Sequence, residues 1–148
     1  MQINMDKHHI KELISAALTA REYSYSPYSG FAVGAALLTE SGKIYTGCNV
    51  ENAAYSPTNC AERTAFFKAV SEGEKEFAAI AVCGGKAGRP PAFCCAPCGV
   101  CRQVMAEFCR PEFIIYSAVS PEVYDKCTLA DILPMAFGPG SIREADNI

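Results

Sequence analysis

The sequence predicts an α/β fold in a single domain spanning residues 1–148. This length matches one domain, since single cores usually run about 100 to 200 residues. Half of the residues are hydrophobic and 20% are charged, which supplies a buried core and excludes a disordered chain. Strand-like and helix-like segments alternate in the later part of the chain, and this order favours parallel neighbouring strands there.

The first part of the chain predicts a helix followed by a hairpin. Apolar residues at helical spacing indicate an amphipathic helix over residues 6–21. A loop rich in turn-forming residues ends it, and an apolar, strand-like run covers residues 31–39. Glu40-Ser41-Gly42 separates this run from a second strand over residues 43–49, so we expect the two strands to form a hairpin.

The second part of the chain alternates helices and strands. The segments are, in order, a helix over 60–72, a strand over 77–83, a loop over 84–91, a helix over 98–108, a strand over 112–117 and a short helix over 128–133.

Charge and hydropathy exclude two classes of partner. The chain has 13 Lys and Arg against 16 Asp and Glu, a net charge of −3, and the basic residues are scattered from Lys7 to Arg143. Nucleic-acid binding needs a concentrated basic patch. No apolar run approaches the roughly 20 residues that cross a bilayer, and residues 1–19 lack a signal-peptide pattern. We therefore expect no nucleic-acid partner, no membrane partner and a cytoplasmic location.

Nine cysteines direct attention to metal or catalytic chemistry, because cytosolic chains rarely use disulfides. Two clusters, 60–63 (Cys-Ala-Glu-Arg) and 97–101 (Pro-Cys-Gly-Val-Cys), each fall at the predicted N-terminus of a helix. The positive end of a helix favours the thiolate form that a metal needs. Cys98 and Cys101 suit one ion from a single turn, and Cys60 would add a third thiolate. Three protein ligands leave zinc one open position, which is typical of a catalytic site.

Both clusters resemble the motifs of zinc-dependent cytidine deaminases. The similarity extends through residues 26–29, 31–37, 47–55 and 133–139, and so covers nearly the whole chain. It implies a three-layer α-β-α fold, with a mixed sheet of about five strands and helices on both faces. It also implies hydrolytic deamination of cytidine and 2'-deoxycytidine, in which zinc acidifies the attacking water and Glu62 moves the protons.

The resemblance is strongest to the short-chain, three-cysteine members of this family, which act on free nucleosides as homotetramers. It implies a role for each of several residues. These are Glu62 as the catalytic residue, Cys60, Cys98 and Cys101 as ligands of one Zn²⁺ per chain, and Phe31, Asn49, Glu51, Ala61, Tyr55 and Phe137 as substrate-binding residues. Asn49 and Glu51 would bind the ribose, and Phe31 would pack against the base. Tyr55 and Phe137 would help to complete a neighbouring subunit's site.

The charge of the proposed centre predicts a role for Arg63. Three thiolates on Zn²⁺ leave a net charge of −1, which weakens the acidification of bound water relative to neutral histidine ligands. Arg63 lies three residues after Cys60 on the same helix, close enough to donate to a ligand sulfur. We therefore expect Arg63 to tune the metal.

The chain departs from the family pattern near the second cysteine cluster. Ala96 replaces a common Ser, the loop over 84–93 is longer than usual, and Cys94 and Cys95 add thiols beside the ligands. Cys95, Cys98 and Cys101 also fit a structural zinc module. An iron–sulfur run fails on spacing, because Met105 occupies the position of its fourth cysteine.

Other interpretations of the same residues remain open. Glu62 also fits a helix cap, since Asn59-Cys60-Ala61-Glu62 has the spacing from N-cap to N3. Cys98 and Cys101 alone also fit a redox pair. A related deaminase for another aminopyrimidine or a nucleoside antibiotic also remains open, although Asn49 with Glu51 favours a ribose.

Overall fold

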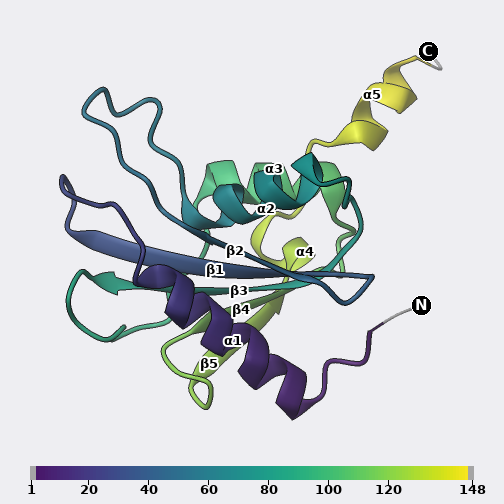
Figure 1. Cartoon of the computed structure of the whole chain (residues 1–148). Helices are drawn as coiled ribbons and strands as arrows, with labels where there is room; N and C mark the ends of the chain where they lie inside the picture. The colour runs from purple at the N-terminus through teal and green to yellow at the C-terminus, as the bar shows by residue number, and fades with distance from the viewer. Residues whose placement is uncertain (1–2, 147–148) are drawn as a thin grey trace.

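A computed structural model describes residues 3–146 and contains one five-stranded sheet between layers of helices (Figure 1). The elements in chain order are α1 Lys7–Arg21, β1 Phe31–Thr39, β2 Ile44–Cys48, α2 Ala61–Ser71, β3 Phe77–Lys86, α3 Gly99–Phe108, β4 Ile114–Ala118, β5 Tyr124–Thr128, α4 Leu129–Ile132 and α5 Pro139–Ala145. The strand order is β2-β1-β3-β4-β5. Within this sheet β3 and β4 pair in parallel and the other neighbouring strands are antiparallel, so the predicted mixed sheet is confirmed.

Helices cover both faces of the sheet, which confirms the three-layer prediction. Leu13 and Ala17 of α1 pack on one face, in a cluster with Ala36 of β1. Phe66 of α2 and Met105 of α3 belong to a second cluster on the opposite face. Successive side chains of a strand point to opposite faces, so a strand covered on both sides is apolar throughout. No helix among residues 3–146 is long and apolar enough to cross a membrane.

Two glycines allow helices to approach the sheet closely. A Cβ atom at Gly34 would lie 2.0 Å from the carbonyl oxygen of Ala17 in α1. A Cβ atom at Gly47 would lie 2.4 Å from the carbonyl oxygen of Ala61, the first residue of α2. Any larger residue would push these backbones apart. Gly47 therefore places the start of α2, and the Cys60 motif with it, directly against β2.

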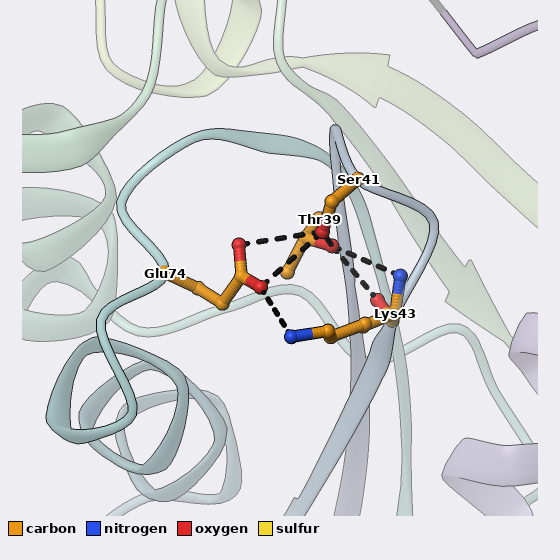
Figure 2. A network of polar contacts seen from close by, with 4 residues as sticks. All are labelled: Thr39, Ser41, Lys43 and Glu74. Carbon is orange, nitrogen blue, oxygen red and sulfur yellow. Dashed lines mark hydrogen bonds and ion pairs between the residues drawn. The ribbon is translucent and has the colours of Figure 1, made fainter.

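A polar network closes the turn between β1 and β2 (Figure 2). The buried hydroxyl of Thr39 bonds to Ser41 Oγ at 2.8 Å and accepts from the backbone N–H of Lys43 at 3.0 Å. Lys43 Nζ pairs with Glu74 Oε1 at 2.9 Å, and Glu74 follows the end of α2. The network thus ties the hairpin turn to the segment that leaves α2.

The structure corrects three expectations about the elements. The loop expected to begin at Gly84 begins later, because β3 continues to Lys86 by pairing with the start of β1, where Phe31 faces Lys86. The edge strand β5 was not predicted, since its partly exposed residues lack an apolar run. Helix α5 was not predicted either, because it has no buried residue and projects from the rest of the chain (Figure 1).

Candidate active site

Three thiols meet where α2 and α3 begin. Cys60 and Cys98 are the N-cap residues of these helices, and Cys101 is a buried residue in the first turn of α3. The three sulfur atoms lie within 4.8 Å of one another, and the Sγ atoms of Cys60 and Cys98 are 3.8 Å apart. Tetrahedral zinc with Zn–S bonds of about 2.3 Å holds two sulfurs about 3.8 Å apart. The donor set therefore fits zinc, and the predicted ligands come together.

Positive charge surrounds this cluster. Both helix N-termini lie at the thiols, and the partial positive charge of a helix N-terminus favours thiolate. Arg63 Nη2 donates to Cys60 Sγ at 3.3 Å, as the sequence spacing predicted. A hydrogen bond from Cys101, and next the contact with Arg63, lower the pKa of Cys60 to about 5. Cys60 is thus prepared to bind a cation.

Glu62 is a buried carboxyl group beside the cluster. Its residue is only 4% exposed, and burial raises the pKa of Glu62 to about 7. A carboxyl group that titrates near neutral pH can both accept and release a proton there. The helix-cap interpretation of Glu62 is wrong, because Cys60 is the N-cap and Glu62 is the second helical residue. The side chain of Asn59 instead donates to Thr64 Oγ1 at 3.1 Å.

Asn49 anchors the beginning of β1. Its Nδ2 donates to the carbonyl oxygen of Phe31 at 2.8 Å, and its Oδ1 accepts from the backbone N–H of Val33 at 2.9 Å. The hydroxyl of Ser24 donates to the same Oδ1. An amide nitrogen has two N–H donors, and within residues 3–146 only one of those of Asn49 is used.

Glu51 and Tyr55 lie together at a surface cavity. Glu51 accepts from the backbone N–H groups of Tyr28 and Ser29 at 3.0 and 3.1 Å. Hydrogen bonds from the Ser29 hydroxyl and backbone lower the pKa of Glu51, so it is ionised at neutral pH. Tyr55 is 73% exposed, and its ring centroid is 6.3 Å from that of Tyr28. These residues line a cavity of about 370 Å³.

Phe31 and Cys95 both lie close to Gly84 of β3. A Cβ atom on Gly84 would lie 3.0 Å from Phe31 Cε1 and 3.1 Å from Cys95 Sγ. Burial and then the nearby charge of Glu62 raise the pKa of Cys95. Phe31 and Cys95 thus lie beside the same position in β3, and Cys95 is near enough to be affected by the charge of Glu62. Among residues 3–146, Cys95 does not belong to the group of sulfurs that could share one metal ion, which opposes the structural zinc module.

Phe137 lies elsewhere, between α4 and α5. It is 63% exposed and lines a cavity of about 600 Å³ formed largely by the segment 133–141. Gln103 Nε2 donates to its carbonyl oxygen at 2.8 Å. The structure therefore places Phe137 and Tyr55 at the surface, outside the cluster of Cys60 and Glu62.

Two residues near the site were missed by sequence reasoning. The ring of Phe93 lies 6.1 Å from that of Phe31, centroid to centroid. Arg21, at the end of α1, donates to the carbonyl oxygens of Lys86 and Arg89 in the same region. Phe93 could have been identified from the sequence, because it is an aromatic residue in a loop of otherwise polar and small residues. The contacts of Arg21 could not, because no local pattern indicates them.

The mixed α/β sheet, the three-thiolate centre and the buried carboxyl define a zinc-dependent hydrolytic enzyme. Residues 7–117 match the family model of the cytidine and deoxycytidylate deaminase zinc-binding region. The chain is 52% identical over 136 residues to the cytidine deaminase of Sporosarcina psychrophila, covering 92% of this chain and 96% of the relative.

Solved structures give the same result. The cytidine deaminase from Burkholderia pseudomallei is 48% identical, with a TM-score of 0.77 and coverage of 90% of this chain and 100% of that one. The cytidine deaminase from Mycobacterium tuberculosis is 37% identical, with a TM-score of 0.74 and coverage of 91% and 99%. The chain belongs to the cytidine and deoxycytidylate deaminase family.

Proposed function

We propose that this protein deaminates cytidine and 2'-deoxycytidine to uridine and 2'-deoxyuridine with release of ammonia. The observation that carries the proposal is the buried Glu62 beside the thiols of Cys60, Cys98 and Cys101. The names of the relatives support the substrate class, because each of the proteins described above is a cytidine deaminase.

The residues divide the reaction between them. Zinc, when held by Cys60, Cys98 and Cys101, supplies acidification of the attacking water. Glu62 would take one proton from that water and deliver it to ring N3 as the oxygen adds to C4. It would then take the second proton from the added hydroxyl and give it to the amine, which leaves as ammonia as the C4 carbonyl forms. The pKa of about 7 suits this role, because both protonation states of Glu62 are accessible at neutral pH.

Arg63 completes the electrostatics of the centre in this proposal. Three thiolates and Zn²⁺ carry a net charge of −1, and the guanidinium of Arg63 compensates for that charge through its contact with Cys60. Arg63 Nε is buried and has no hydrogen-bond partner within the described part of the chain.

Substrate binding is assigned to residues around the cluster. Phe31 packs against the base, while the second side-chain N–H of Asn49 and the ionised Glu51 bind the ribose hydroxyls. Ala61 lies between Cys60 and Glu62 and is fully buried, so its part in binding comes from main-chain atoms beside the base.

We further propose a homotetramer with shared active sites. Tyr55 and Phe137 are large, exposed side chains that one copy leaves uncovered, and a partner subunit would place them over its neighbour's nucleoside. Other exposed apolar or aromatic residues could contribute to the same interfaces, among them Tyr23, Tyr28, Val100 and Met135. Light scattering that shows a monomer in a dilute, fully active sample would refute this assembly.

A cytoplasmic location is part of the proposal. It is favoured by nine cysteines, three of them in a metal-ligand arrangement that needs reduced thiols.

The proposal is tested by following the cytidine absorbance with purified protein. We expect the absorbance of cytidine to fall, the activity to stop after a zinc chelator is added, and zinc to restore it. Glu62→Gln is the matched control, since it keeps the size of the side chain and removes its ability to carry protons. Zinc-loaded, folded protein without deaminase activity would exclude the proposed function and favour a non-enzymatic zinc module.

A further inference from the structure

We propose that Phe93 forms a second aromatic wall of the nucleoside pocket, next to Phe31, and that Arg21 is the positioning residue that holds this wall in place. The inference rests on the proposed function and adds a residue that determines base affinity. Phe93 is 53% exposed, although an aromatic side chain of this size normally gains by burial. Its ring is tilted 40° from that of Phe31, with centroids 6.1 Å apart.

Phe93 lies in a chain segment that leads to the cysteine cluster. Phe31 Cε1 and Cys95 Sγ would lie 3.0 and 3.1 Å from a Cβ atom on Gly84, so both side chains approach the same position of β3. Cys95 follows Phe93 by two residues and precedes the metal ligand Cys98 by three. The segment that carries Phe93 therefore leads directly into the metal cluster.

Arg21 fixes the relative placement of Phe31 and the Phe93 segment. Its guanidinium donates to three carbonyl oxygens, with Nε to Ala32 at 2.9 Å, Nη2 to Lys86 at 2.9 Å and Nη1 to Arg89 at 2.8 Å. Ala32 follows Phe31 in β1, while Lys86 is the last residue of β3 and Arg89 lies in the loop that leads from it to Phe93. One side chain thus joins both walls. Lysine cannot replace it, because only the planar guanidinium presents several donors in fixed directions.

Two neighbouring aromatic faces suit a flat pyrimidine ring. Stacking of a base on an aromatic side chain is tolerant of base identity and depends on the ring face. The base is stacked in the ground state and in the transition state alike, so loss of one wall raises KM and leaves kcat nearly unchanged.

The first test compares Phe93→Ala, Phe93→Leu and Phe93→Tyr with the parent. We expect Phe93→Ala to raise KM for cytidine by about 5- to 100-fold, with kcat within about threefold and zinc still bound. Phe93→Leu keeps apolar volume and should still raise KM, whereas Phe93→Tyr keeps the ring face and should remain close to the parent. Phe67→Ala is the control, since Phe67 is an exposed phenylalanine of α2.

Three results would overturn the role of Phe93. They are a KM of Phe93→Ala within twofold of the parent, a KM of Phe93→Leu equal to that of the parent, and a change in Phe67→Ala as large as that in Phe93→Ala. The first two mean that no aromatic wall is present, and the third means that the effect is not local.

Arg21→Lys tests the positioning step. It keeps the positive charge and removes the fork of donors, so we expect a rise in KM with little change in kcat. In the double variant with Phe93→Ala, the KM should not exceed that of Phe93→Ala alone, because both changes remove the same wall. Multiplicative effects would show that Arg21 acts independently of Phe93.

Calorimetric binding of cytidine separates this inference from the proposed function. If the parent binds cytidine without turnover, the proposed function fails, but a weaker Kd in Phe93→Ala still supports the wall. If the parent deaminates cytidine and Phe93→Ala binds as tightly as the parent, only the wall is refuted. If the parent does not bind cytidine, both fail.

Discussion

The metal cluster and the residues assigned to the nucleoside differ in how the fold holds them. Cys60, Cys101 and Glu62 belong to the starts of two helices that pack on one face of the sheet, and Glu62 is buried there. Tyr55 and Phe137 lie on exposed segments between elements. In the function proposed above, the chemistry would therefore lie inside one copy of the chain, whereas enclosure of the nucleoside would depend on surface segments that other copies can reach.

The largest expected effect tests whether the cluster is the metal site. Cys101→Ala removes a buried ligand, so we expect loss of zinc and of all measurable activity. Cys95→Ala is the matched control, because it removes a nearby thiol outside the ligand group and should keep one zinc per chain. The zinc content per chain is measured for Cys101→Ala, Cys95→Ala and Cys60→Ala. Zinc lost from Cys95→Ala and retained in Cys60→Ala would mean that the ligand assignment is wrong.

Glu62→Ala tests whether the interior carboxyl carries the chemistry. We expect a folded, zinc-loaded protein whose turnover falls by at least about 10²- to 10⁴-fold, the range typical of a general acid–base group. Cytidine should still bind, since Phe31, Asn49 and Glu51 are unchanged. Steady-state kinetics and calorimetry measure both quantities. Turnover within tenfold of the parent in the zinc-loaded variant would remove Glu62 from the mechanism.

Arg63→Gln is expected to have a smaller effect, because it acts through a ligand rather than on the substrate. The variant keeps hydrogen-bonding capacity near Cys60 but loses the charge that compensates for three thiolates. We expect activity or zinc affinity to fall by about 10- to 100-fold, the usual range for partners of metal ligands. Titration with a competing chelator and measurement of kcat test this. If neither changes, Arg63 has only a packing role.

The same contrast explains what the sequence could predict. Cys60, Glu62, Cys98 and Cys101 lie in two short motifs, and the helical pattern after each motif placed them at helix starts. The cap assignment failed by one position, because α2 begins at Ala61 and its N-cap is Cys60 rather than Asn59. Local patterns were therefore enough to predict that Cys60, Cys98 and Cys101 come together, with Glu62 beside them.

Long-range and surface features could not be predicted in this way. Arg21 finds its three carbonyl partners 11, 65 and 68 residues away, and no local pattern encodes such contacts. Strand β5 is an edge strand held by pairing with β4, not by an apolar run of its own. The environment of Phe93 likewise depends on a loop folding back onto β1.

The smallest expected effect concerns the network at the hairpin turn (Figure 2). This network has no role in the metal cluster or in the proposed binding of the nucleoside. The hydrogen bond and charge of Lys43 lower the pKa of Glu74, and the same contact raises the pKa of Lys43. The pKa of Glu74 is lower in the folded chain than the value of about 4.3 for glutamate in an unfolded chain, so the ionised carboxylate stabilises the fold at pH values above about 4.3. This stabilisation is lost as the pH falls through the pKa of the folded state. A raised lysine pKa stabilises the fold below about 10.4, and that benefit is lost as pH rises through the folded value.

Urea unfolding of the parent and Glu74→Gln across pH should therefore show a small stability difference that is constant from about pH 5 to 10 and narrows on both sides. Glu122→Gln, which breaks the exposed pair with Lys11, is the matched control and should change stability less. Cytidine turnover at neutral pH should be the same in all three proteins, because neither glutamate contacts the site. A stability difference that does not depend on pH would mean that the Lys43–Glu74 charges contribute nothing and that Glu74 acts through its hydrogen bonds to Ser41 alone.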